Sequence, residues 1–109
     1  MIVLSANARI FLYRQHTDMR KGFEGLSSMV YSIFQMDVTC GAYFVFLNRR
    51  RDRMKVLYWD GDGLALWYKR LEKGSFPLPT GTDFLERRQF FMLLEGVVPQ
   101  SVQKRYKVS

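Results

Sequence analysis

The segment from residue 43 to residue 71 limits the folds open to this chain more than any other feature. Three stretches in it, residues 43–47, 54–59 and 64–71, are rich in aromatic and aliphatic side chains and contain no glycine or proline. The stretches NRRRDR and DGDG lie between them, and Asp-Gly suits the positive φ of a tight hairpin. The pattern predicts three strands joined as two consecutive β-hairpins.

Alternation along these strands predicts two faces. Successive side chains of a strand point to opposite faces, and directly paired residues share a face. With connections of even length at both turns, one face is predicted to be a core face, interrupted only by Lys69, and it carries Tyr43, Val45, Leu47, Met54, Val56, Tyr58, Ala65, Trp67 and Leu71. The other face mixes aromatic and basic residues and carries Phe44, Phe46, Arg53, Lys55, Leu57, Trp59, Leu64, Leu66, Tyr68 and Arg70.

The mixed face has two interpretations. If it is exposed, its aromatic side chains can stack on nucleobases or anchor a protein interface, and its cations can neutralise phosphates. The candidates for stacking or interaction are Phe44, Phe46, Trp59 and Tyr68. Alternatively, a helix covers the apolar end of this face and only the charged end reaches water. We favour the second interpretation, because two amphipathic helices need a surface to pack on.

The first of these helices is predicted after a short strand at residues 9–13. Thr17 is a suitable N-cap, although Gly22 and Gly25 disfavour the first turns. One helical stripe is apolar and consists of Phe23, Leu26, Val30, Ile33 and Phe34.

A second helix is predicted at residues 83–95, with Thr82 as its N-cap and Gly96 as its C-cap. The elements together predict an α+β fold, in which a small antiparallel sheet of about three to five strands packs with two amphipathic helices. We expect one domain over residues 1–98, followed by a short basic tail at residues 99–109.

The chain is strongly basic, with 17 Lys and Arg against 10 Asp and Glu and a formal charge of +7. Such a charge favours nucleic acid or another polyanion as a partner. The cations gather around NRRRDR and the strand ends, so the predicted nucleic-acid-binding residues are Arg49, Arg50, Arg51, Arg53, Lys55, Lys69 and Arg70. A solvated turn is the alternative. Arg20 and Lys21 join the prediction, because cations in a first helical turn oppose the helix dipole and a bound anion would relieve this; simple exposure is the alternative there too.

No pattern of residues indicates catalysis or metal binding. Asp60 and Asp62 suit a hairpin turn, and two turn aspartates do not make a two-metal site. His16 has no clear nucleophile to serve, and Cys40 is the single cysteine. We therefore expect no catalytic residue, no metal and no cofactor. A metal-dependent nuclease that uses Asp60 and Asp62 is the least favoured function.

The chain contains no apolar run near the ~20 residues that a membrane span needs. Its first residues lack a basic segment before a long apolar stretch, so we expect no signal peptide. Together with the single cysteine, this predicts a cytoplasmic protein without membrane contact.

Two motifs resemble a known family. TDMRKGFEGL and YFVFLNRRRDRMKVLYWDGDGLALWYKRLEKGSFPLP, in this order from about Ile10 to Pro79, resemble the Orf2-like protein, called TnpB, of bacterial insertion-sequence family sixty-six. Tyr58, where a second Trp is common, and the tail after Pro99 depart from the family pattern. The polar positions that match are Asp18, Arg20, Lys21, Arg49, Arg50, Asp52, Arg53, Lys55, Asp60, Lys69, Arg70 and Glu72.

The resemblance implies an accessory role in transposition, beside a separate transposase that carries the catalytic acidic residues. It implies no catalytic role for any matching position. Combined with the charge pattern, it predicts a non-catalytic protein that contacts DNA, at the ends of the insertion sequence or at its target, through the basic hairpin. The alternative is a protein-interaction module that recruits or stabilises the transposase without binding DNA. The sequence does not decide the oligomeric state.

Overall fold

The computed structural model describes residue 4 and residues 6–95. Its elements are β1 (Ile10–His16), α1 (Phe23–Met29), a π-helical continuation (Val30–Phe34), a 3-10 turn (Val38–Cys40), β2 (Tyr43–Leu47), β3 (Arg53–Trp59), β4 (Leu64–Arg70), β5 (Phe84–Leu85) and α2 (Arg87–Glu95). None of the helices among these residues is long and apolar enough to cross a membrane.

The five strands form one mixed sheet in the order β4-β3-β2-β1-β5. β1 runs parallel to β2, because α1 returns the chain between them, and every other neighbouring pair is antiparallel. The predicted α+β fold, with two consecutive hairpins and two helices, is confirmed, although the sheet is mostly rather than entirely antiparallel because β1 pairs with β2 in parallel.

The hairpin register confirms the two predicted faces. Leu47 pairs with Met54 across the first turn, and Trp59 pairs with Leu64 across the second. Both connections therefore act as even-length loops, as the alternation argument requires.

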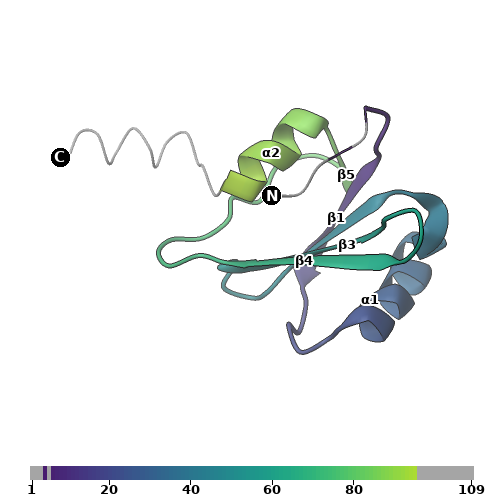
Figure 1. Cartoon of the computed structure of the whole chain (residues 1–109). Helices are drawn as coiled ribbons and strands as arrows, with labels where there is room; N and C mark the ends of the chain where they lie inside the picture. Colours follow the sequence, from purple (N-terminus) through teal and green to yellow (C-terminus); the bar gives the residue numbers. More distant parts are fainter. Residues whose placement is uncertain (1–3, 5, 96–109) are drawn as a thin grey trace, which may run out of the picture.

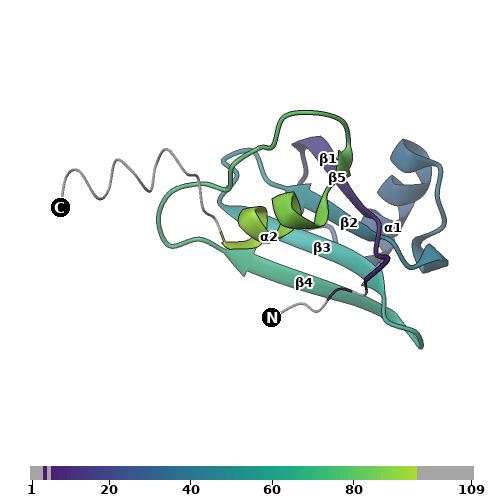
Figure 2. The same cartoon turned by 90° about the horizontal axis from the view of Figure 1, so that it is seen from above.

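A helix covers each face of the sheet (Figure 1). Figure 2, seen from above, shows α2 lying over β3 and β4, and Figure 1 shows α1 below the sheet, on the face opposite α2. The core on the α2 side contains the predicted core face, including Val45, Val56 and the helical residue Phe90. The core on the α1 side contains Phe44 and Phe46, which are 0% exposed. The prediction that these two aromatic residues lie exposed for stacking is therefore wrong. The alternative, that a helix covers this end of the face, is correct for both.

Both helices begin later than predicted. Thr17 is buried and donates its backbone N–H to the carbonyl of Leu47, so it does not cap α1, whose N-cap is Gly22. Phe84 and Leu85 pair with β1 as a short strand, so α2 begins at Arg87 rather than after Thr82. The predicted C-cap Gly96, the domain end at residue 98 and the tail at residues 99–109 lie outside the described residues.

Candidate functional site

The two sequence motifs meet at one edge of the sheet. The parallel strands β1 and β2 both end there, β3 begins there, and Arg53 pairs with Arg70 at the end of β4. The backbone N–H of Thr17 donates to the carbonyl of Leu47 at 2.7 Å. The last residue of β1 and the four residues after it (segment 16–20) therefore lie beside the turn between β2 and β3, taken together with the first residue of β3 (loop 48–53).

Loop 48–53 is closed by the side chain of Asn48. Its Oδ1 accepts hydrogen bonds from the backbone N–H groups of Asp52 and Arg53, both at 3.0 Å, and its Nδ2 donates to Asp52 Oδ1 at 2.6 Å. The backbone N–H of Arg51 donates to the carbonyl of Asn48 at 3.0 Å, and Arg51 has a positive φ of 57°. The carbonyl of Asp52 accepts from the N–H of Leu71, which ties the loop to the end of β4. The loop therefore holds its arginines on a fixed backbone.

The arginines of the loop form no ion pair with a carboxylate among the residues that the structure describes. Arg49, Arg50 and Arg51 are exposed and Arg53 is half-buried. Within the described part of the chain, the ion pairs are Arg14–Asp83 and Arg20–Asp18, and neither involves the loop. Positive charge therefore exceeds the negative charge of Asp18 and Asp52 at this edge, as the prediction of a basic cluster requires. Arg70, exposed at the same edge, adds to it.

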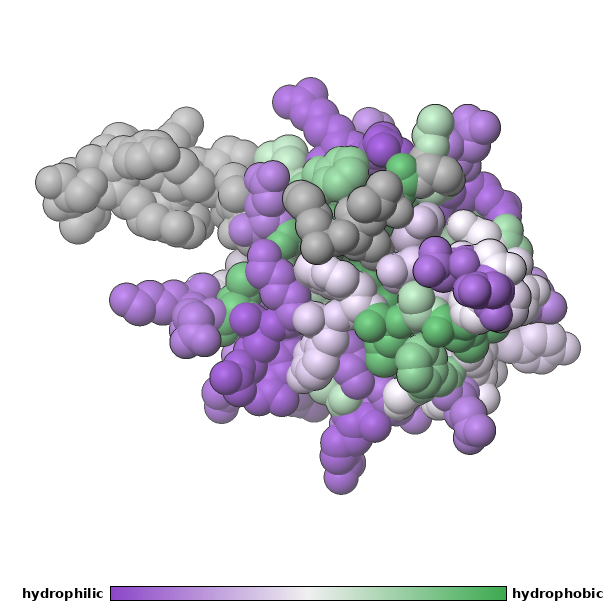
Figure 3. All heavy atoms as spheres, viewed as in Figure 1, coloured by the Kyte–Doolittle hydropathy of each residue, from purple (hydrophilic) through white to green (hydrophobic). Residues whose placement is uncertain are grey.

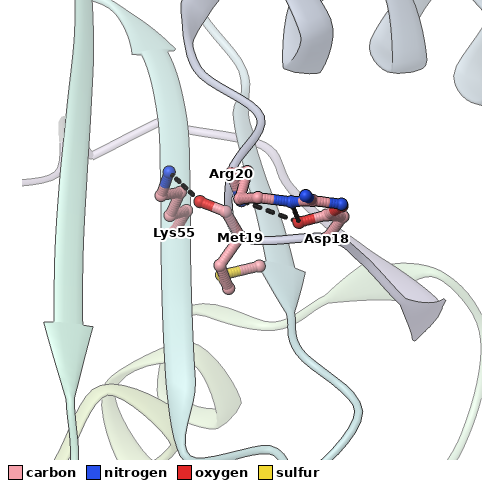
Figure 4. Close-up of polar contacts among 4 residues, drawn as sticks. All are labelled: Asp18, Met19, Arg20 and Lys55. Atoms are coloured by element: carbon pink, nitrogen blue, oxygen red, sulfur yellow. Dashed lines mark hydrogen bonds and ion pairs between the residues drawn. The ribbon is translucent and has the colours of Figure 1, made fainter.

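Segment 16–20 contains a local ion pair, drawn in Figure 4. The Asp18 carboxylate accepts hydrogen bonds from the backbone N–H of Arg20 at 2.9 Å and from Arg20 Nη2 at 2.7 Å. These bonds lower the pKa of Asp18 from 3.8 to about 2. Because its pKa is lower in the folded protein, the contribution of Asp18 to stability is present above pH ~4 and is lost as the pH falls toward 2. Arg20 precedes α1, and its charge is balanced by Asp18.

Two predicted DNA contacts are instead bound to backbone carbonyls. Lys55 is 7% exposed; its Nζ donates to the carbonyls of Met19 at 2.7 Å and Lys21 at 2.8 Å, and lies 4.9 Å from the centre of the Tyr68 ring. Figure 4 shows Lys55 reaching across from β3 to this segment. Lys69 Nζ donates to the carbonyl of Leu94 at 2.7 Å, in the last turn of α2. Neither ammonium group is the open surface cation that the sequence predicted.

A concavity of about 570 Å³ separates segment 16–20 from loop 48–53. It is lined by His16, Thr17, Asp18, Met19, Arg20, Asn48, Arg49, Arg50, Asp52 and Arg53. A neighbouring hollow of about 330 Å³ lies beyond His16 and Arg49 and is lined also by Arg14, Gln15, Leu47, Asn48, Arg51 and Leu78.

Three side chains near this edge were not singled out as binding candidates from the sequence. His16 Nε2 lies 3.4 Å from Arg49 Nη2, and Thr17 forms part of the concavity wall. Arg14 donates to the carbonyls of Pro79 and Thr82 and so holds the chain before β5. The parallel pairing of β1 with β2 brings these residues to the loop, and the sequence carries no direct signal of that pairing.

The remaining predicted residues lie apart from the concavity. Trp59 is half-buried at the far end of β3, while Tyr68 is 49% exposed on β4 beside Lys55. Asp60 and Asp62 occupy the turn at the far end of the sheet, where the N–H of Asp60 donates to the carbonyl of Gly63. No group of three or more metal-ligating side chains forms among the residues that the structure describes.

The surface is hydrophilic over most of the face in Figure 3, with a smaller hydrophobic area that lies between β4 and α1. Large apolar side chains with substantial exposure also include Phe23, Tyr31 and Phe84. None of these three side chains lines the concavity between segment 16–20 and loop 48–53.

Comparisons with known proteins agree with the resemblance of the two motifs. The model of a family described as IS66 Orf2 like protein matches residues 8–104. The chain is 38% identical over 100 residues to the uncharacterized protein y4jC of Sinorhizobium fredii, which covers 89% of this chain and 86% of that protein. It is 34% identical over 100 residues to the uncharacterized protein y4hO of the same organism, covering 89% and 87%. No solved structure matches the chain.

Proposed function

Because the chain belongs to the family of IS66 Orf2-like proteins, we propose that it is a non-catalytic accessory protein of transposition that contacts DNA through loop 48–53. Family membership supports the accessory role. The DNA contact is supported by one observation above all: a loop of arginines, held on a fixed backbone, that forms no ion pair within the described part of the chain. The DNA is that of the insertion-sequence ends or of the target, and the partner protein is the transposase encoded by the same element.

The contact surface in this proposal is smaller than the set predicted from the sequence. It comprises the exposed cations of the basic edge, namely Arg49, Arg50, Arg51, Arg70 and Lys21, with the half-buried Arg53 and the Asp18-paired Arg20 beside them. Phe44, Phe46, Lys55 and Lys69 are excluded, because the first two are buried and the other two hold backbone carbonyls. Arginine at such a surface forms paired hydrogen bonds to phosphate oxygens and releases counterions from DNA.

Fluorescence anisotropy with labelled duplex and single-stranded DNA tests the proposal. We expect the wild-type affinity to fall steeply between ~50 and ~200 mM salt, because each neutralised phosphate releases counterions. The fourfold variant Arg49→Ala, Arg50→Ala, Arg51→Ala and Arg53→Ala should lose binding.

A matched pair of double variants distinguishes a contact made by the loop from a general effect of the net charge on DNA binding. Arg50→Ala with Arg51→Ala removes two exposed cations of the loop, and Arg9→Ala with Arg88→Ala removes two exposed cations elsewhere. The first pair should weaken binding much more than the second. Equal effects of the two pairs, or undiminished binding by the fourfold variant, would exclude the loop as the contact.

The exposed apolar side chains favour a second candidate function, a module that recruits or stabilises the transposase. Aromatic residues anchor protein interfaces, and Phe23, Tyr31 and Phe84 are exposed here. Co-purification with the transposase, lost in Tyr31→Ala with an unchanged circular dichroism spectrum, would support this function. Failure to form a complex at micromolar concentration would count against it.

A further inference from the structure

We propose that the concavity between segment 16–20 and loop 48–53 is a seat for a single phosphate group of a nucleic-acid strand. This inference rests on the proposed function and deepens it, since it names the chemical group that is held and the residues that hold it. Segment 16–20 forms one wall of this seat and loop 48–53 forms the other, so the seat is a defined site and not a diffuse basic surface.

The charge of the concavity suits one phosphate. Four arginines and two aspartates line it, which gives a formal charge of +2 with His16 neutral. Both aspartates already accept hydrogen bonds from the protein, Asp18 from Arg20 and Asp52 from Asn48. The guanidinium groups of the loop arginines, which make no ion pair within the described chain, therefore remain for a ligand. A phosphodiester carries one negative charge and a terminal phosphate about 1.5 to 2.

Both walls are held in place without a ligand. Lys55 fixes segment 16–20 through the carbonyl of Met19, and Asn48 fixes loop 48–53 through the N–H groups of Asp52 and Arg53. The hydrogen bond from Thr17 to Leu47 joins the two at the base. A site that is ordered before binding loses less conformational entropy when the ligand arrives. Its volume of about 570 Å³ admits a phosphate together with its sugar.

Thr17 supplies an independent observation. It is 4% exposed, it forms part of the wall, and its hydroxyl has no hydrogen-bond partner among the described residues. A buried hydroxyl without a partner lowers stability unless a ligand or water satisfies it. A phosphate oxygen in the concavity provides such an acceptor once the hydroxyl turns toward it.

The test compares single variants inside the seat with matched variants outside it. Arg53→Ala is matched by Arg88→Ala, an exposed arginine of α2. Thr17→Val is matched by Ser27→Ala. The hydroxyl of Ser27 is also buried without a hydrogen-bond partner among the described residues, but it lies on α1 outside the concavity. We expect Arg53→Ala to weaken DNA binding about tenfold or more, and Thr17→Val to weaken it severalfold without lowering the melting temperature. Both matched variants should stay within about twofold of wild type.

Two probes complete the test. A short oligonucleotide with and without a 5′-phosphate distinguishes the sources of the phosphate: tighter binding of the phosphorylated strand assigns the seat to a strand end, and equal binding assigns it to an internal phosphodiester. Inorganic pyrophosphate, titrated into the isotopically labelled protein, should shift the backbone amide signals of Thr17 and Arg53.

The two proposals fail in different ways. If wild type binds DNA, and the Arg50 and Arg51 double variant weakens it while Arg53→Ala and Thr17→Val do not, the seat is wrong and the basic-loop contact stands. If wild type binds pyrophosphate at these amides but no DNA even at low salt, the concavity holds phosphate, but both the DNA contact and the assignment of that phosphate to a nucleic-acid strand are wrong. Binding of neither overturns both.

Discussion

Arg51 shows what one residue contributes to the basic loop. Its φ of 57° lies in the left-handed region, which side chains with a Cβ adopt at a cost and glycine adopts freely. Its backbone N–H closes the turn by donating to the carbonyl of Asn48. A residue that is strained and also exposed is compatible with a functional role for its side chain.

The variant Arg51→Gly should therefore be more stable and bind DNA less well. Relief of the left-handed conformation should raise the free energy of unfolding by up to about 1 kcal/mol, while loss of one cation weakens phosphate binding. Urea denaturation and anisotropy measure the two effects.

Two controls separate these effects. Arg51→Ala removes the same charge but keeps the Cβ, so it should weaken binding with no gain in stability. Gln35→Gly relieves the same kind of strain, at a φ of 53° at the end of the π-helical turn, and should gain stability with unchanged binding. A loss of stability in Arg51→Gly would contradict the strain argument.

At the scale of elements, the segment between β1 and α1 depends on a side chain from another strand. Residues 17–22 form no helix, and Lys55 of β3 donates to two of their carbonyl groups. Its ammonium group also lies over the Tyr68 ring of β4. Lys55 is therefore a positioning residue that connects three elements and holds one wall of the concavity.

The variant Lys55→Met keeps the apolar stem but removes the donor. It should lower the free energy of unfolding by about 1–3 kcal/mol, because the part-buried hydrogen bonds to the carbonyls of Met19 and Lys21 are lost. DNA affinity should fall as well, since one wall loses its support. Chemical denaturation and anisotropy at a temperature where the variant is folded provide the measurements.

Lys69→Met provides the comparison for stability. It breaks a single hydrogen bond, to the carbonyl of Leu94 on the other side of the sheet, and should cost less than Lys55→Met. Equal stability of wild type and Lys55→Met would show that water replaces the lysine at both carbonyls.

At the scale of the whole molecule, one sheet serves two cores. Every residue of β2 is buried, and its side chains enter the two cores alternately. Strands covered on both faces consist of nearly continuous apolar residues, as in YFVFL. The two helices are therefore coupled through the strands they share, although they do not pack on the same face.

This arrangement predicts that damage to either core unfolds the whole domain. Phe44→Ala on the α1 side and Phe90→Ala on the α2 side should each lower the free energy of unfolding by about 3–5 kcal/mol, in a single transition. Phe23→Ala, at a side chain 48% exposed, should cost much less. Urea denaturation followed by circular dichroism and tryptophan fluorescence provides the measurement. Transitions that separate between the two probes would contradict the coupling.

Several features of the fold and site could be read from local patterns. The hairpin register follows from the length of two turns and from alternation, so the faces of β2, β3 and β4 were predictable. The first residues of the two helices were not predictable in this way. Thr17 and Thr82 have side chains suited to N-caps. However, the backbone N–H of Thr17 donates to the carbonyl of Leu47, and the residues after Thr82 pair with β1 as a strand. At both sites, hydrogen bonds to strands distant in the sequence override the local preference for helix capping.

The sequence by itself determined where positive charge is concentrated and which side chains share a face, because both depend on residues close together in the chain. Only the tertiary structure decided that Phe44 and Phe46 are buried, that Lys55 is a support rather than a surface cation, and that segment 16–20 faces loop 48–53. The physical reason is the parallel pairing of β1 with β2, which joins residues distant in sequence and leaves both faces of the sheet to be covered by helices.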